Sequence, residues 1–268
     1  MIMKKFVAKA VGCILAAVSV FSLAACNNNA DSDKKNIQDA GKIIVGITDY
    51  APMDYKDENG KWIGFDAELA EMFAKTLDVT CEFVEIVDWN NKVAEINSKE
   101  IDLIWNGMTA SEELGQQIDF SVSYAKNAQV AVVLNTSNIT TKEQIKAASI
   151  AVENGSAGQA VAEDEGMTNV SAPGNQKQAL IEVMSGNSDV AIIDITMAQS
   201  LVGKGDFANL KIVDGISYGD EIFAVGLRKG SDLKEDLDNF LKAQYANGTI
   251  TALAEKYGVG INTEALSK

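Results

Sequence analysis

Short apolar runs alternate with amphipathic stretches along most of this chain, which is the pattern of buried strands followed by helices. Residues 42–47 are rich in isoleucine and valine and predict a buried parallel strand. Apolar side chains at helical spacing follow over residues 66–78, and Asp66 is placed to cap that helix. The unit is completed by a strand, a helix and a strand, over residues 81–87, 89–97 and 101–105. This order predicts a mostly parallel sheet with helices on both faces.

The same order of elements begins again near residue 140. Strands are expected at 149–152 and 190–193. Helices are expected at 142–147 and 177–185, and a third helix ends at residue 165. Two strand-like runs, residues 129–134 and 221–227, lie where the chain would cross between the units. Two helices, over 232–246 and 250–257, close the chain.

These elements predict an α/β fold of two doubly wound lobes, with the second lobe inserted into the first. Lobe 1 is expected to comprise residues 41–130 and 222–268, and lobe 2 residues 131–221, joined by two crossover hinge strands. Ligands of open α/β sheets bind outside the C-terminal ends of the strands, so a ligand cleft is expected between the lobes.

The N-terminus is typical of an export signal. Three lysines precede an apolar run of 13 residues, which is shorter than the roughly 20 residues that span a bilayer. Small residues then precede Cys26 in a sequence that resembles the bacterial lipobox, so a signal peptide of residues 1–25 would be removed and the thiol diacylated. A plain secretory signal with an incidental cysteine is the alternative. Residues 26–40 are mostly polar and are expected to be a flexible tether that anchors the protein to the outer face of the membrane.

Composition excludes several functional classes. The chain has 38 acidic and 23 basic residues, a formal charge of −15, no histidine and a single arginine, Arg228. An acidic chain lacks the basic face that nucleic acids need, and without histidine neither a Ser-His-Asp triad nor a histidine-bound metal can form. We therefore expect no nucleic-acid partner, no metal and no cofactor. Removal of residues 1–25 takes away three lysines and no acid, so a mature charge of −18 would leave membrane attachment to the lipid anchor alone.

Several short motifs occur in a fixed order between residues 41 and 260. They are Ala51-Pro52-Met53, Asn59-Gly60, Gly64-Phe65-Asp66, Asp88-Trp89, the run from Ile101 to Thr109, Asp119-Phe120-Ser121, Gly155-Ser156 and Asn247-Gly248-Thr249. Their joint order and spacing resemble those of the bacterial extracellular solute-binding proteins of the polar amino-acid type, the receptors of ABC importers. The resemblance implies a periplasmic-binding-protein-like fold of type II. It also implies a monomeric receptor without catalytic residues, which carries an amino acid or an amine to a membrane permease.

The resemblance implies contacts to the side chain of the ligand at three residues. Tyr50 and Trp89 match aromatic positions that hold a ligand side chain between them, and aromatic faces suit aliphatic stems and cations. Asp49 matches an acid that can face a polar or cationic side chain, in a loop that is about one residue shorter than the family pattern.

The resemblance also implies a site for an α-ammonium group. Gly107 and Thr109, with Asn106 and Met108 beside them, match positions whose carbonyl and hydroxyl hold that ammonium. Asp194 ends a predicted strand and matches the acid that pairs with it. The structural alternatives are an ordinary turn at Gly107 and a helix cap at Asp194.

A third site, for the α-carboxylate, is implied at Ser156 and Ala157. Both lie where a helix begins, and helix N-termini bind anions; a plain helix cap at Ser156 is the alternative. The family usually adds an arginine to this site, but Leu114 occupies that position here. The helix end, or a lysine such as Lys126 or Lys177, would then suffice, or the ligand would lack a carboxylate, or binding would be weak.

Two further functional classes remain open at this point. Asp49 or Asp194 would have to act as a general acid if the chain were a dehydratase, which some proteins of this fold are. A sensory ligand-binding module is the other class. Trp105 precedes the expected contact loop, where it would either reshape the pocket or pack in the core.

Overall fold

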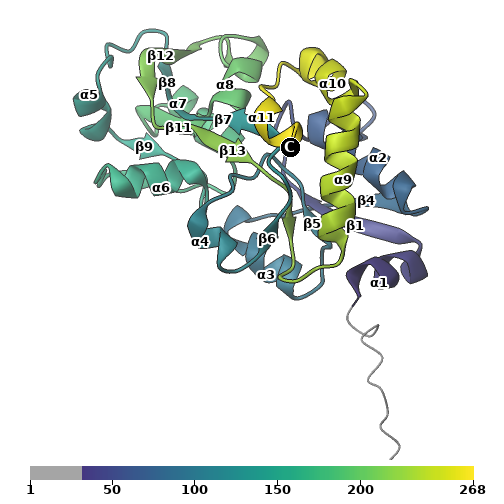
Figure 1. The fold of residues 1–268 in the computed structure, drawn as a ribbon. Coiled ribbons are helices and arrows are strands. Elements are labelled where there is room, and N and C mark those ends of the chain that lie inside the picture. Colours follow the sequence, from purple (N-terminus) through teal and green to yellow (C-terminus); the bar gives the residue numbers. More distant parts are fainter. Residues whose placement is uncertain (1–31) are drawn as a thin grey trace, which may run out of the picture.

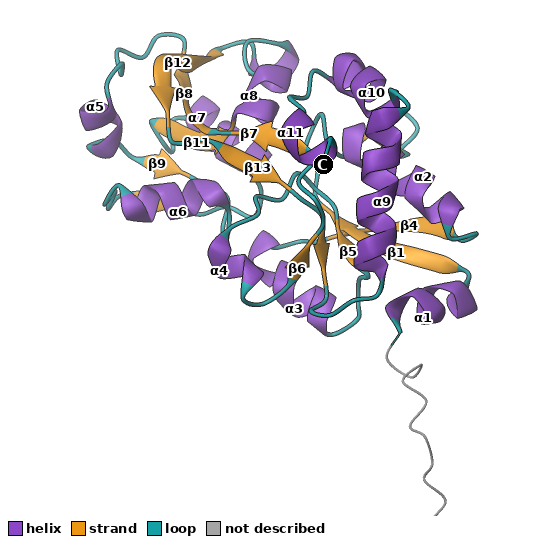
Figure 2. Cartoon of the chain, in the orientation of Figure 1, coloured by secondary structure: helices purple, strands orange, loops and turns teal. Residues whose placement is uncertain are grey.

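A computed structural model describes residues 32–268, so the predicted signal peptide and Cys26 lie outside the described residues. The chain forms two lobes, each built on a five-stranded sheet with helices packed around it (Figures 1 and 2). The strand orders are β4-β1-β5-β14-β6 and β10-β9-β11-β8-β12. The predicted α/β fold of two lobes is confirmed. Over residues 32–268, every helix is too short or too polar to cross a membrane.

The first sheet takes strands from both halves of the chain. β1 (Lys42–Ile47) lies between β4 (Thr80–Glu85) and β5 (Leu103–Ile104), and both pairings are parallel. β14 (Gly226–Leu227) then pairs antiparallel with β5 and with β6 (Asp119–Phe120). A small hairpin of β2 (Tyr55–Lys56) and β3 (Trp62–Ile63) stands apart from it. The helices of this part of the chain are α1 (Asp33–Ala40), α2 (Phe65–Thr76), α3 (Lys92–Asn97), α4 (Glu112–Gly115), α9 (Leu233–Ala246), α10 (Thr249–Tyr257) and α11 (Thr263–Leu266).

The second sheet is built around β11 (Val190–Asp194), which is buried along its whole length. It pairs in parallel with β9 (Ile150–Ala151) and antiparallel with β8 (Gln129–Leu134). β10 (Val170–Ser171) and β12 (Leu210–Ser217) form the two edges. The helices of this lobe are α5 (Lys142–Lys146), α6 (Ala157–Asp164), α7 (Gln176–Ser185) and α8 (Ile195–Leu201).

Two short strands, β7 (Ala125–Asn127) and β13 (Glu221–Phe223), run side by side between the lobes as an antiparallel pair (Figure 1). The prediction of a crossover at 129–134 is therefore wrong, because that run is a core strand of the second sheet. Residues 221–227 contain the crossing strand β13 and then β14. β8 and β14 enter their sheets directly from this hinge, without an intervening helix. A helical crossover would have kept them parallel to their neighbours, and without one both run antiparallel.

The prediction of a flexible tether is wrong over residues 33–40, which form helix α1. Ile37 is buried in the hydrophobic core of the first lobe. Asp33 forms a buried ion pair with Arg228 at 2.8 Å, and the same guanidinium lies 3.1 Å from Asp102. One apolar side chain and one buried carboxylate hold this two-turn helix against the lobe. The rest of the segment is mostly polar, and its composition therefore suggested a tether.

Two further sequence expectations concern buried residues of the first lobe. Trp105 is fully buried and packs edge-on against Phe73, with ring centroids 6.3 Å apart, so it belongs to the core. Asp66 does not cap α2, whose N-cap residue is Gly64. Its side chain is buried inside the lobe instead, where it accepts a hydrogen bond from the Tyr124 hydroxyl at 2.8 Å.

Candidate functional site

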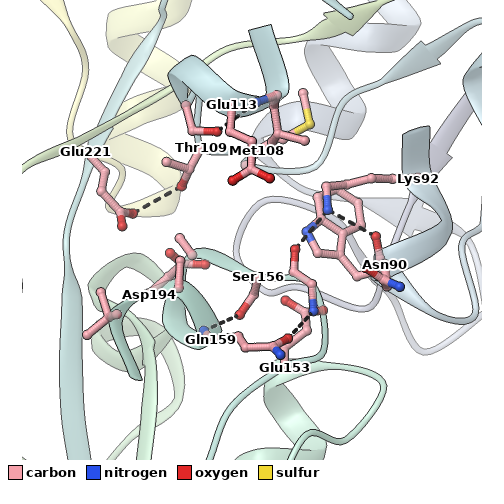
Figure 3. A pocket seen from close by; sticks show the side chains of 18 of the residues that line it. Asn90, Lys92, Met108, Thr109, Glu113, Glu153, Ser156, Gln159, Asp194 and Glu221 are labelled. Carbon is pink, nitrogen blue, oxygen red and sulfur yellow. Dashed lines mark hydrogen bonds between the residues drawn. The ribbon is translucent and has the colours of Figure 1, made fainter. Parts of the chain in front are cut away.

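A cleft of about 580 Å³ lies between the two lobes (Figure 3). Its walls come from the loop after β5, the turn before α3, helices α4 and α6, and the strand ends of β11 and β13. Nine of the ten predicted contact residues line it, namely Tyr50, Trp89, Asn106, Gly107, Met108, Thr109, Ser156, Ala157 and Asp194. Residues from distant parts of the sequence meet here because the strand ends of both sheets face the same space.

Hydrogen bonds to buried groups of the first lobe hold the loop after β5 in shape. Gly107 has a φ of +55°, and a Cβ atom there would lie 2.6 Å from the ring of Tyr50, so this position requires glycine. The Gly107 N–H donates to the buried carboxylate of Asp66 at 2.6 Å. The Asn106 side chain accepts from the Thr48 N–H at 2.8 Å and donates to the Thr48 hydroxyl at 2.7 Å. The amide of Asn106 therefore fixes the loop rather than projecting freely into the cleft.

Two acidic side chains meet at one end of the cleft. Asp194 is 4% exposed, and its carboxylate accepts hydrogen bonds from three side-chain amides, including those of Asn127 and Gln129. Glu221 accepts from the same two amides at 2.8 and 3.0 Å, and from the Thr109 hydroxyl at 3.1 Å. Two shared amides thus hold two carboxylates together. Glu221 was not predicted as a contact residue, because it lies on the returning hinge strand, 112 residues after Thr109.

The electrostatics at this end of the cleft favour a positive group. Burial, and after it the charge of Glu221, raises the pKa of Asp194 to about 6. The Tyr50 hydroxyl is buried and makes no well-aligned hydrogen bond to any group within residues 32–268. Burial, followed by the charge of Asp194, raises the pKa of Tyr50 well above its usual value, so the hydroxyl stays protonated and can donate.

The two lobes touch each other beside the cleft. Lys92 on α3 donates from Nζ to the carbonyl of Gly155 at 2.8 Å and to that of Trp89 at 3.2 Å. The side chain of Asn154 donates to the carboxylate of Asp88 at 3.0 Å. These contacts join the turn before α3 to the loop before α6, so the two lobes meet directly beside the cleft.

Asp49 is the predicted contact residue that does not line the cleft. Its carboxylate pairs with Lys177 of α7 at 2.9 Å, which is a further contact between the lobes. The short loop places Tyr50 rather than Asp49 in the cleft wall. Lys177 is occupied by this ion pair, and Lys126 on β7 is exposed and does not line the cleft.

Helix α6 directs its N-terminus at the cleft. The Ser156 hydroxyl accepts from the Gln159 N–H at 3.2 Å, so the expected helix cap is present. The Gly155 N–H donates to the Gln159 side chain at 2.7 Å, which closes the turn. The next N–H groups, of Ala157 and Gly158, have no earlier carbonyl of the helix to bind, and they carry the positive end of the helix dipole.

Residues 43–260 match the model of the bacterial extracellular solute-binding proteins, family 3. The chain belongs to this family. It is 30% identical over 258 residues to the arginine-binding extracellular protein ArtP of Bacillus subtilis, with 92% of this chain and 96% of that protein covered. It is 26% identical to the L-cystine-binding protein TcyJ of Escherichia coli K12, with 82% and 84% covered. Among solved structures, a mutant of ArgBP from T. maritima aligns with a TM-score of 0.79 and 28% identity, over 84% of this chain and 99% of that one.

The expected resemblance is therefore confirmed, and the chain is an extracytoplasmic solute-binding protein. Leu114, on α4, lines the cleft of this family 3 protein at the position where an arginine was expected. The single arginine, Arg228, is buried in the first lobe between Asp33 and Asp102, away from the cleft lining. Lys92 is the one basic side chain among the described residues that line the cleft. Lys92 was not predicted as a cleft residue, because a lysine in an amphipathic helix normally faces solvent.

Proposed function

We propose that this protein captures one amino acid between its lobes and delivers it to the permease of an ABC importer. The observation that carries this proposal is the convergence of Thr109, Asp194 and Glu221 on a cleft that both lobes enclose. The cleft volume of about 580 Å³ lies in the range of small-molecule pockets. Relatives named as arginine-binding and L-cystine-binding proteins support an amino acid as the ligand class.

The α-ammonium group of the ligand would bind between the loop after β5 and the end of β11. An ammonium has three N–H donors, which suits the carbonyl of Gly107, the hydroxyl of Thr109 and the carboxylate of Asp194. Glu221 adds a second carboxylate that already touches Thr109. Tyr50 and Trp89, both buried in the cleft wall, would hold the ligand side chain.

The α-carboxylate would bind to the first N–H groups of α6, at Ser156 and Ala157. A helix N-terminus stabilises an anion by about 0.3–2 kcal/mol, compared with about 1.5–3 kcal/mol for a hydrogen bond to a charged group. Leu114 provides no such charged hydrogen bond, so the ammonium end would supply the larger share of affinity. Of the three possibilities that the missing arginine leaves open, we favour the helix end.

Closure would bring the two lobes together around the ligand. The expected boundaries after residues 130 and 221 would divide β8 and β13. We propose residues 33–124 with 224–268, and residues 128–220, as the two bodies, with β7 and β13 as the hinge between them. The contacts of Lys92 with Gly155 and of Asn154 with Asp88 would form only in the closed state. A ligand that touches both lobes would stabilise that state.

Substitution of Gly155 by alanine is expected to weaken ligand binding by about 10- to 100-fold, since overpacking a contact costs about 1–3 kcal/mol. Gly155 has a φ of +71°, and a Cβ there would lie 2.7 Å from the Cα of Asn90 in the other lobe. Gly166→Ala is a matched control, because Gly166 has a φ of +65° and only the flexible Lys146 side chain nearby. Titration calorimetry together with small-angle scattering would measure affinity and closure. Equal affinity in both variants would contradict a close approach of the lobes at Gly155.

The same proposal covers the cellular setting of the protein. A diacylated Cys26 would hold it on the outer face of the cell membrane as a monomer, within reach of the permease. Binding and release by hinge motion need no chemistry, so no residue of the cleft is assigned a catalytic role.

A thermal-shift screen of residues 27–268 against the natural amino acids tests the function. A true ligand at 100 times its Kd adds about 2.7 kcal/mol to the stability of the folded state. The des-amino analogue of the best ligand should give no shift, because it lacks the group that faces Asp194. The absence of a shift with every amino acid, or turnover of a bound one, would refute the proposal.

A further inference from the structure

Glu153 is a buried acidic side chain of the cleft that the capture of the α-ammonium and α-carboxylate groups does not use. It follows β9, lines the cleft and is 4% exposed. Within residues 32–268, its carboxylate lies beyond ion-pair distance from every lysine and from the arginine. Burial, followed by the charge of Asp194, raises the pKa of Glu153 to about 8, and the nearby Gln176 and Lys92 offset only part of this. A buried carboxylate that faces a cleft without a full counter-charge is expected to have its partner in the ligand.

Lys92 does not supply that partner, although it lines the same part of the cleft. Its ammonium group donates to two backbone carbonyls, those of Trp89 and Gly155, and lies 5.0 Å from the centre of the Trp89 ring. Figure 3 shows Lys92 with Asn90 at one end of the pocket, while Glu153 lies next to Ser156. Lys92 is thus used to join the lobes, and its charge acts on Glu153 only from a distance.

The charges of the closed cleft are unbalanced in one direction. Six acidic residues line it: Asp194, Glu221 and Glu153 are buried or half-buried, and Glu113, Glu163 and Asp164 are exposed. Lys92 is the one basic group there among the described residues. The α-ammonium of an amino acid balances one more negative charge, but its α-carboxylate adds another. With a pKa of about 8, Glu153 is largely protonated in the free protein near neutral pH. A ligand whose side chain carries a positive charge would favour the ionised form of Glu153 and pair with it, whereas a neutral side chain would leave it uncharged.

We propose that Glu153 selects amino acids whose side chain carries a positive charge, a specificity that rests on the proposed amino-acid function. The side chain would extend from the ammonium end, between Tyr50 and Trp89, and bring its cationic group against the Glu153 carboxylate. Gln176 lines the cleft next to both carboxylates: its amide donates to Asp194, and it offsets part of the pKa rise of Glu153. Gln176 therefore contacts both acids, and a ligand with two positive groups would have one acid for each.

The test compares arginine with citrulline, which replaces the guanidinium by a neutral urea of nearly the same shape. Calorimetric titration of the wild-type protein at pH 7.5 should show arginine, lysine or ornithine binding about 10- to 100-fold more tightly than citrulline. Glu153→Gln should reduce this ratio to about one while leaving the affinity for citrulline within about threefold of wild type. Glu163→Gln removes the same charge from an exposed residue at the rim of the cleft and should leave the ratio unchanged.

The outcomes separate the specificity from the function. Tight binding of neutral or acidic amino acids in preference to basic ones overturns the role of Glu153 and leaves the amino-acid function intact. A ratio that survives Glu153→Gln overturns it as well, and the wild-type comparison stands even if that variant does not fold. Failure of every amino acid to bind would instead overturn the function itself.

Discussion

Asp194→Asn is expected to lower the affinity for the amino-acid ligand by about 100-fold or more. Asparagine keeps the shape of the side chain but removes the charge that faces the α-ammonium group. Removing one member of a buried charge pair costs about 2–5 kcal/mol, because the other charge is left desolvated. The measurement is calorimetric titration of both proteins with the best ligand of the thermal-shift screen. Glu163→Gln is the control, since it changes the net charge of the cleft rim by the same amount.

The pH dependence of affinity gives a second readout for the same carboxylate. The group binds a cation in its ionised form, and its pKa in the free protein is about 6, so the contribution of Asp194 to affinity should be full at pH 7 and fall below pH 6. The fall approaches tenfold per pH unit for one proton. Among the groups that face Asp194, Glu221 and Glu153 are acidic, Tyr50 stays protonated, and the amides of Asn127, Gln129 and Gln176 do not titrate. A profile between pH 6 and 4 that is as steep in Asp194→Asn as in wild type would contradict this assignment.

Arg228→Met is expected to lower the free energy of unfolding by about 3–5 kcal/mol. The guanidinium is buried between Asp33 and Asp102, whose side chains are 7% and 16% exposed, and methionine would leave both carboxylates without a counter-charge. The two carbonyls that Arg228 also bonds, those of Ile96 and Ile101, would lose their donor. Urea unfolding followed by circular dichroism would measure the loss.

The matched control for this variant is Lys35→Met on the same helix α1. Lys35 pairs with Asp39, but both side chains are at least half exposed, so its removal should cost no more than about 1 kcal/mol. Hydrogen exchange should show the amides of α1 released in Arg228→Met and protected in Lys35→Met. A loss below 1 kcal/mol in Arg228→Met would mean that α1 is not held by this ion pair.

Local patterns predicted most of the fold. The run of isoleucine and valine at 42–47 is β1, and the amphipathic stretch at 177–185 is α7 to within one residue. The same patterns placed Gly107, Ser156 and Asp194 at the ends of strands or the start of a helix, where they line the cleft. These predictions succeed because periodicity and turn chemistry act between residues close together in the sequence.

The missed features depend on contacts between residues far apart in the sequence. Glu221 joins Asp194 and Thr109 only after the chain has returned through the hinge, and no local pattern shows this. Arg228 was noticed as a rarity, but its role depends on Asp33, 195 residues earlier. Glu153 and Lys92 are residue types that normally lie on the surface, and no local pattern predicts that both are buried here.

The position of β14 in the first sheet also determines the order in which the molecule can form. The sheet order is β4-β1-β5-β14-β6, so β6 at residues 119–120 has no neighbour until residues 226–227 have been synthesised. The second sheet needs only residues 129–217, a continuous stretch. Loop closure over a long separation is slow, and a chain of this size commonly folds in parts. The inserted second lobe is thus the first that can be completed during synthesis, and the lobe that holds both ends of the described chain is the last.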